Sequence, residues 1–245
     1  MSVLLMTVWL TGCVQEELGS TPSPAGNGIR FTLTVPDVNL PSVSSRTMTG
    51  AGTAKKEDEI ETVDILVFDA SKTPAVYLEW VTATGVTQDL ADNSTVSFSA
   101  KLPFTTASTC IVVVANRELD DIVSGFKKGV TTKVEAMEKM LHTQTGKWLA
   151  DGSTTGGYTR IPMYGEKVIN KITPSMEPIT GINMKRMLAR IDIHNNSVTS
   201  NFTVEEVYLA NYNTTGYIAP PWNTNGQVTE PAPDTPVLPA NSGKM

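Results

Sequence analysis

The sequence predicts an all-β fold, a β-sandwich that carries a small helical insertion. Many short apolar or alternating stretches are separated by Gly, Pro, Asn and Ser, a pattern typical of sandwiches rather than of parallel α/β sheets. Apolar residues at helical spacing appear between residues 117 and 142. The chain has a net charge of -6 and no basic stripe that could follow phosphates, so we expect no nucleic-acid partner.

The first expected strand covers residues 29–35. Its apolar residues alternate with polar ones, so one face is predicted to be buried. These apolar residues are Ile29, Phe31, Leu33 and Val35. Pro36 ends the strand, and the polar stretch 41–59 that follows shows no hydrophobic period. We therefore predict an exposed loop around Arg46.

Further strands are expected on both sides of the helical insertion. Those before it lie at 61–70, 76–81, 95–101 and 109–115. The last of these is continuously apolar, which predicts a place inside a sheet. Those after it lie at 160–164, 166–172, 179–184, 189–194 and 202–210.

Two short helices are expected within the insertion. The apolar residues of the first follow the i, i+3, i+4, i+7 spacing of one helix face; they are Leu119, Ile122, Val123 and Phe126. Thr132 and Glu135 resemble a capping box that starts the second helix. The apolar face of that helix would hold Val134, Met137, Met140 and Leu141. We interpret the methionines as core packing rather than as a cofactor site.

Residues 1–12 are interpreted as a lipoprotein signal peptide and residues 13–28 as a flexible tether. The stretch Leu10-Thr11-Gly12-Cys13 resembles the bacterial lipobox, in which Cys13 becomes the lipidated N-terminus and holds the protein to the outer membrane. Each buried acyl methylene would contribute about 0.8 kcal/mol. The alternative is an ordinary buried cysteine. Since the first basic residue is Arg30, we expect the natural start to lie upstream.

We predict no enzyme, metal site or cofactor. The chain has two histidines, His142 and His194, which we interpret as polar residues at the end of a helix and of a strand. The sequence contains no nucleophile elbow, Walker loop or Cys/His pair at ligand spacing. Cys110 is expected in the core, and the acidic pairs Asp120–Asp121 and Glu205–Glu206 on the surface. Two distant carboxylates brought together as a glycosidase site stay an open alternative.

Four segments together resemble one family. They are EIETVDILVFD (59–69), IVVVANREL (111–119), RIPMYGE (160–166) and MKRMLARIDIHN (184–195). With the lipobox they are similar to the N-terminal domain of Bacteroidetes fimbrillins, the fimbrial subunits of the FimA and Mfa type. The resemblance covers about residues 10–219 and implies a transthyretin-like β-sandwich over 29–219 that is assembled into a surface fimbria. Residues 220–245 would be a Pro-rich linker or the start of a truncated second domain.

The resemblance also implies how such a subunit assembles. An Arg-specific protease cuts in the loop after the first strand, and a strand from another fimbrial subunit fills the groove that the first strand leaves. Here the matching bond joins Arg46 and Thr47. The four apolar side chains of the removed strand contribute roughly 6 to 12 kcal/mol of burial, the scale of a whole domain's stability. The alternative for Arg46 is an ordinary solvated loop residue.

Three roles stay open at this stage. A shaft subunit would lose its lipid and its first strand, whereas an anchor subunit would keep both. A surface glycan-binding lipoprotein would not polymerise and would stack sugar rings on exposed aromatic residues. The candidates for stacking are Trp80, Trp148, Tyr158, Tyr164, Tyr212, Tyr217 and Trp222.

Overall fold

The computed structural model describes residues 28–35, 58–89, 95–143, 160–188, 205 and 214–219. Some of the predictions above fall outside these residues. They concern the signal peptide and nearly all of the tether with Cys13, the loop with Arg46 and Thr47, the strand at 189–194 with His194, and the strand at 202–210 except for Glu205.

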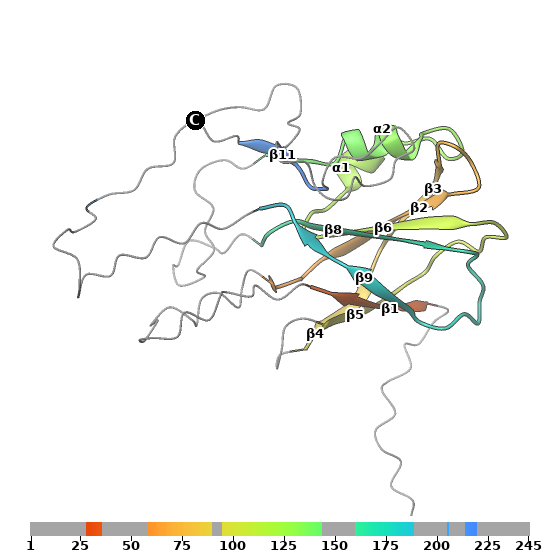
Figure 1. Ribbon diagram of the computed structural model, residues 1–245, viewed down its shortest axis with the longest axis horizontal. Helices are drawn as coiled ribbons and strands as arrows, with labels where there is room; N and C mark the ends of the chain where they lie inside the picture. The colour runs from red at the N-terminus through yellow and green to blue at the C-terminus, as the bar shows by residue number, and fades with distance from the viewer. Residues whose placement is uncertain are drawn as a thin grey trace, which may run out of the picture.

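The described residues form a two-sheet β-sandwich with a helical layer on one side (Figure 1). The four-stranded sheet has the order β4 (Thr84–Gln88), β5 (Thr95–Ala100), β1 (Ile29–Thr34) and β9 (Ile179–Asn183). The five-stranded sheet has the order β10 (Lys185–Arg186), β8 (Met163–Ile169), β6 (Thr109–Ala115), β2 (Val63–Asp69) and β3 (Val76–Thr82). The predicted β-sandwich with a helical insertion is therefore confirmed.

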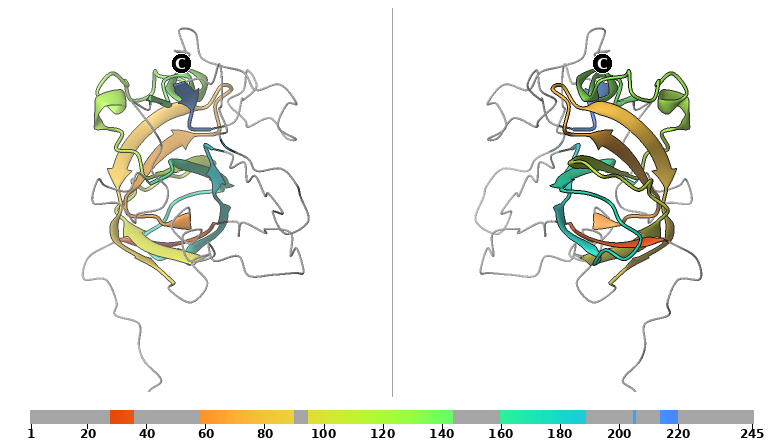
Figure 2. Two further views of the ribbon diagram at one scale, coloured as in Figure 1. Left: turned by 90° about the vertical axis from the view of Figure 1, so that its left-hand side faces the viewer. Right: turned by 90° about the vertical axis from the view of Figure 1, so that its right-hand side faces the viewer.

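The helical layer covers the outer face of the five-stranded sheet (Figure 2). It contains α1 (Asp120–Val123), α2 (Lys133–Glu138) and a small two-stranded pair formed by β7 (Leu141–Thr143) and β11 (Thr215–Tyr217). Ile218 and Ala219, which follow β11, are buried against the same face.

The five-stranded sheet is buried on both faces because it lies between two cores. One core fills the sandwich, and the other lies under the helices. Successive residues of β2 and β6 point alternately into the two cores, so both strands are apolar at nearly every position. This explains why the 109–115 stretch is continuously apolar, and its predicted place inside a sheet is confirmed, since β6 lies between β8 and β2.

The prediction of two separate strands at 160–164 and 166–172 is wrong. A single strand, β8, runs through both and includes Gly165. A Cβ atom at Gly165 would lie 2.8 Å from Ile182 Cγ2, 2.8 Å from Met184 Sδ and 3.0 Å from the carbonyl oxygen of Asn183. Gly165 is therefore the place where the chain passes over β8 at close range, rather than a break in the strand.

The helix predictions are partly right. The capping box is confirmed, because Thr132 Oγ1 accepts from the Glu135 backbone N–H at 3.2 Å and Glu135 Oε2 accepts from the Thr132 N–H at 2.8 Å. The predicted apolar face is confirmed at Met137 and Met140, which are at most 1% exposed in the core under the helices. It is wrong at the start of α2, where Lys133 is 3% exposed and Val134 is half-buried. His142 does not end a helix but lies in β7.

Four short strands were not predicted, namely β4, β7, β10 and β11. β4 is polar and holds Gly85 at a φ of +65°, so it shows no alternation that a sequence pattern could detect. The other three are two or three residues long.

Candidate functional site

β1 lies inside the four-stranded sheet, between β5 and β9. It pairs antiparallel with β5, from Ile29 opposite Ala100 to Thr34 opposite Thr95. It pairs parallel with β9, where Thr34 lies opposite Asn183. Without β1, the strands β5 and β9 would face each other across a gap of two strand spacings, roughly 9.6 Å. We call this gap the β1 slot.

The inner face of β1 is a large part of the sandwich core. Its four apolar side chains are at most 7% exposed; they are Ile29, Phe31, Leu33 and Val35. The rings of Phe31 and Phe98 on β5 stack with their centroids 4.9 Å apart and their planes 8° from parallel. The intervening Arg30 is exposed. The alternation that predicted a half-buried strand is therefore observed.

The proposed processing residues Cys13, Arg46 and Thr47 lie outside the described residues. The order of the chain nevertheless gives one relation between Arg46 and the fold. β1 ends at Thr34 and the next strand that the structure describes, β2, begins at Val63, so Arg46 lies in the stretch of chain that joins them. A cut after Arg46 would leave β1 held to the sandwich by non-covalent contacts alone.

The chain re-enters the described structure at Asp58, beside the end of the slot where β1 stops. We call residues 58–62 the end clamp, because they contact β4, an edge strand of the four-stranded sheet, and β10, the edge strand of the five-stranded sheet that continues β9. On the β4 side, the Gln88 side chain donates to the carbonyl oxygen of Asp58 at 2.8 Å and accepts from the Ile60 N–H at 3.0 Å. On the β10 side, Arg186 pairs with the Asp58 carboxylate, and the two side chains are 15% and 13% exposed.

Asn116 attaches the end clamp to the five-stranded sheet. Its side-chain amide donates to the carbonyl oxygens of Glu59 at 2.8 Å and Ile161 at 3.0 Å, and its Oδ1 accepts from the Glu61 N–H at 2.9 Å. Its φ of 59° is in the left-handed region, which Asn tolerates better than most residues. Arg160 adds ion pairs to Glu59 at 3.1 Å and Glu61 at 2.6 Å. None of these clamp contacts was predicted from the sequence.

A polar group is buried under the helices, on the opposite side of the five-stranded sheet. Lys133 Nζ lies 2.5 Å from Glu166 Oε2, to which the Tyr164 hydroxyl also donates. Burial raises the pKa of Tyr164 above its usual range, and the Glu166 charge adds to this. Burial also raises the pKa of the neighbouring Cys110 thiol to about 11. Cys110 is 3% exposed, as predicted for a core residue.

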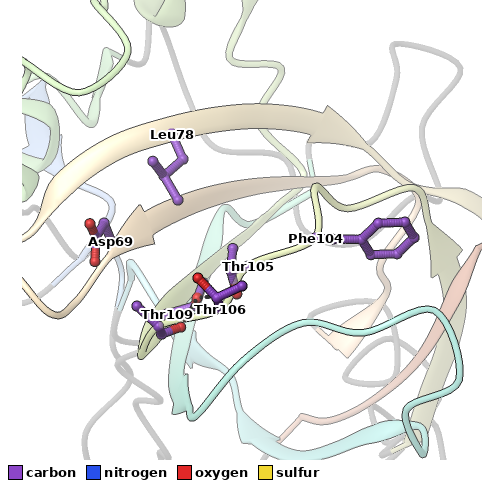
Figure 3. Close-up of a pocket in the computed structure, with 7 residues that line it drawn as sticks. Asp69, Leu78, Phe104, Thr105, Thr106 and Thr109 are labelled. Atoms are coloured by element: carbon purple, nitrogen blue, oxygen red, sulfur yellow. Dashed lines mark hydrogen bonds between the residues drawn. The ribbon is translucent and has the colours of Figure 1, made fainter.

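A hollow of about 260 Å³ lies between β2, β3 and the loop that leads into β6 (Figure 3). Its threonines are engaged within the fold, because Thr105 Oγ1 lies 2.7 Å from Thr109 Oγ1 and accepts from the Ile172 N–H at 2.9 Å. Asp69 also lines the hollow, and the hydroxyl of Ser71 donates to it and lowers its pKa. Phe104 is 61% exposed at the far side of the hollow from Asp69.

The aromatic residues proposed for glycan stacking have mixed positions. Tyr164 is 2% exposed and presents no open face, whereas Trp80 is half-buried and packs against the core under the helices. Tyr217 is half-buried in β11. The remaining candidates lie outside the described residues; they are Trp148, Tyr158, Tyr212 and Trp222.

Within the residues that the structure describes, no helix has the length and apolar character needed to cross a membrane. In the same part of the chain, no group of three or more His, Cys, Asp or Glu residues is placed to hold a metal ion.

Comparison with known proteins gives one family and several similar solved structures. No curated protein matches the chain. A fimbrial assembly protein from Parabacteroides distasonis is 13% identical with a TM-score of 0.44, and the match covers 86% of this chain and 75% of that one. A protein from the same organism that is described as a cell adhesion protein is 19% identical with a TM-score of 0.42. That match covers 79% of this chain and 57% of the other, so this chain spans less than two thirds of its length.

The family match covers most of the sandwich. The model of the major fimbrial subunit protein (FimA) family matches residues 29–196, from the start of β1 to beyond β10. This range includes the β1 slot, the end clamp and the helical layer up to α2 and β7. The chain therefore belongs to the major fimbrial subunit protein (FimA) family.

Proposed function

We propose that this chain is a fimbrial subunit that is exported as a lipoprotein through Cys13 and assembled by strand replacement. In this proposal an Arg-specific protease cuts between Arg46 and Thr47, β1 leaves, and a strand of another subunit enters the β1 slot. The mature subunit is then part of a surface fimbria on the outer membrane.

One observation carries the proposal: β1 is an interior strand that a single cut can release. An interior strand that leaves a sheet exposes a row of backbone donors and acceptors on each side of the gap. It also uncovers the pockets of four apolar side chains, which corresponds to roughly 6 to 12 kcal/mol of lost burial. An extended segment with alternating apolar residues would restore both the hydrogen bonds and the burial.

A strand that replaces β1 must have a defined pattern of apolar residues. Positions 29, 31, 33 and 35 all point into the core, so the entering strand needs an apolar residue at every second position. The flat face of Phe98 makes an aromatic residue the best replacement at the position of Phe31.

Lipidation of Cys13 is the second part of the proposal and rests on the sequence. The lipobox-like stretch ends at Cys13, and an acidic pair, Glu16 and Glu17, follows it. An acyl anchor at this point would keep the uncut subunit at the membrane until the cut after Arg46 separates residues 13–46 from the sandwich.

The proposal is tested with an Arg-specific protease and the variant Arg46→Gln. The matched control is Arg30→Gln, which removes the same charge from an exposed position in β1. Digestion of the wild type and the control is expected to give a new N-terminus at Thr47 by mass spectrometry. After digestion both should also take up a labelled peptide of residues 28–36, whereas Arg46→Gln should do neither. Uptake of the peptide by undigested protein at the same rate would contradict the proposal.

A further inference from the structure

We infer that the end clamp fixes the width of the β1 slot, so that Asp58, Gln88 and Arg186 position β9 to accept a new strand. The inference rests on the proposed function, because it concerns the state of the subunit after β1 has left. It adds residues far from β1 in sequence to those that assembly requires.

The position of β9 explains why it needs an attachment other than β1. Among the described strands, β9 has β1 as its one partner in the four-stranded sheet and forms the edge of that sheet. β5 is different, because β4 pairs with it on the other side. Loss of β1 therefore leaves β5 with one described partner in its sheet and β9 with none. A β9 strand that was free to move could cross the gap and pair with β5, which would close the slot to any incoming strand.

The structure holds β9 through its continuation, β10. After Met184 the chain passes from the four-stranded to the five-stranded sheet, where Lys185 pairs with Tyr164 and Arg186 with Met163 of β8. The passage is close, since Ile182 and Met184 lie directly over Gly165. The side chain of Lys167 on β8 also donates to the carbonyl oxygen of Thr180 in β9. These contacts attach β9 to β8 and do not involve β1.

The end clamp adds a connection between the strands on the two sides of the slot. Gln88 lies opposite Val96 of β5 and Thr34 lies opposite Thr95, so Gln88 marks the same end of the sheet as the end of β1. Arg186 lies just after β9, whose Asn183 faces Thr34 at that end. The contacts of Gln88 and Arg186 with residues 58–60 therefore link β4 to the β9–β10 segment around the end of β1.

The character of these contacts suits a fixed link. The Asp58–Arg186 pair is mostly buried, and such a pair resists separation because either charge left alone in a buried site is costly. Ile60 is 5% exposed and packs in the sandwich core between the two edge contacts. Each clamp contact described above joins residues outside β1, so the cut and the loss of β1 remove none of these contacts.

The test compares the variants Asp58→Asn and Arg186→Gln with the control Lys128→Gln in the full chain. Lys128 is an exposed residue between α1 and α2 in the helical layer, and its replacement lowers the net charge by one, as Arg186→Gln does. Each protein carries a protease site inserted after Arg46, so that the test does not depend on natural processing. After the cut, uptake of a labelled peptide of residues 28–36 is measured.

If the end clamp fixes the width of the slot, both clamp variants should take up the peptide at least about ten-fold more slowly than the wild type and the control. The charge-reversed pair, Asp58→Arg combined with Arg186→Asp, should restore uptake and guards against variants that fold poorly. Equal uptake by the wild type and both clamp variants would overturn the inference.

A second readout separates this inference from the proposed function. Hydrogen exchange is followed in the uncut proteins at residues 179–186 and, for comparison, in β2 and β6. Exchange at 179–186 should be at least about five-fold faster in the clamp variants, with β2 and β6 unchanged. If the cut wild type takes up no peptide, the proposed strand replacement fails. In that case faster exchange at 179–186 still supports the clamp, and unchanged exchange overturns it.

Discussion

Phe31 of β1 and Phe98 of β5 stack face to face inside the sandwich, with ring centroids 4.9 Å apart. This pair joins the strand that is proposed to leave to a strand that stays. The same contact therefore contributes to the stability of the uncut subunit and, if β1 is replaced, to the affinity of the β1 slot for the entering strand.

Truncation of this stack should be costly. Phe31→Ala is expected to lower the free energy of unfolding by about 3 to 5 kcal/mol, because it removes a fully buried ring and leaves Phe98 without its partner. Arg30→Ala, on the exposed face of the same strand, should change it by less than about 0.5 kcal/mol. Urea unfolding of the full chain measures both. Similar values for the two variants would show that β1 is not part of the core.

Gly165 should tolerate no side chain. Gly165→Ala places a Cβ atom 2.8 Å from Ile182 and Met184 and 3.0 Å from a backbone oxygen, so the chain that crosses β8 must move. We expect a loss of about 1 to 3 kcal/mol in the free energy of unfolding. Gly125→Ala is the control, since its Cβ would meet nothing closer than 3.9 Å. A melting temperature unchanged by Gly165→Ala would contradict the close crossing.

Asn116 should contribute through its side chain and its backbone separately. Asn116→Gly keeps the left-handed backbone and loses the hydrogen bonds to the end clamp, which should cost about 1 to 3 kcal/mol. Asn116→Ala loses the bonds and also strains the backbone, so it should cost about 1 kcal/mol more than Asn116→Gly. Urea unfolding ranks the two variants. The reverse order would mean that the backbone conformation is not a constraint.

The buried ion pair under the helices should be sensitive to the loss of one partner. Glu166→Gln leaves the Lys133 charge in a site where the side chain is 3% exposed, and we expect a loss of about 3 kcal/mol. Glu138 is exposed on α2, the helix that holds Lys133, so Glu138→Gln should leave the free energy of unfolding nearly unchanged. Thermal unfolding of the two variants at one pH gives the comparison. An unchanged stability of Glu166→Gln would mean that burial of Lys133 does not depend on the ion pair with Glu166.

The raised pKa of Cys110 predicts that the protein loses stability at high pH. Its pKa is about 11 in the folded protein against 9.0 for an ordinary thiol, so between these values the unfolded chain releases a proton that the folded chain keeps. The stabilisation is complete below pH 9 and is lost as the pH rises from 9 to 11, by roughly 2 kcal/mol between pH 8 and 10.5.

The measurement for Cys110 is urea unfolding of the wild type and Cys110→Ala at pH 8 and 10.5. The raised pKa values of Tyr77 and Tyr164 weaken both proteins alike at high pH, so the difference between the two proteins isolates the thiol. An equal loss in both would contradict the assignment to Cys110.

The strands that contact the cores were largely predictable from the sequence. β1 and β5 alternate because one face of each is buried, and β6 is continuously apolar because both of its faces are covered. Gly165 misled the prediction for β8, because a glycine needed for a close crossing gives the same local pattern as a glycine in a turn. Lys133 misled the prediction for α2, because burial of its charge depends on Glu166, which is far away in the sequence.

The end clamp could not be predicted for a similar reason. Asp58 lies in a polar stretch that reads as loop, and its partner Arg186 is 128 residues away in a basic segment. Nothing local in either segment marks the pair. Only the crossing of β9 to β10 brings Arg186 to the end of the slot.

The N-terminal mass of the chain recovered from assembled surface fibres tests the central claim most directly. If strand replacement operates, the chain in the fibres begins at Thr47 and lacks β1. A chain in the fibres that begins with a lipidated Cys13 and retains residues 29–35 would contradict strand replacement and leave a lipid-anchored subunit in its place.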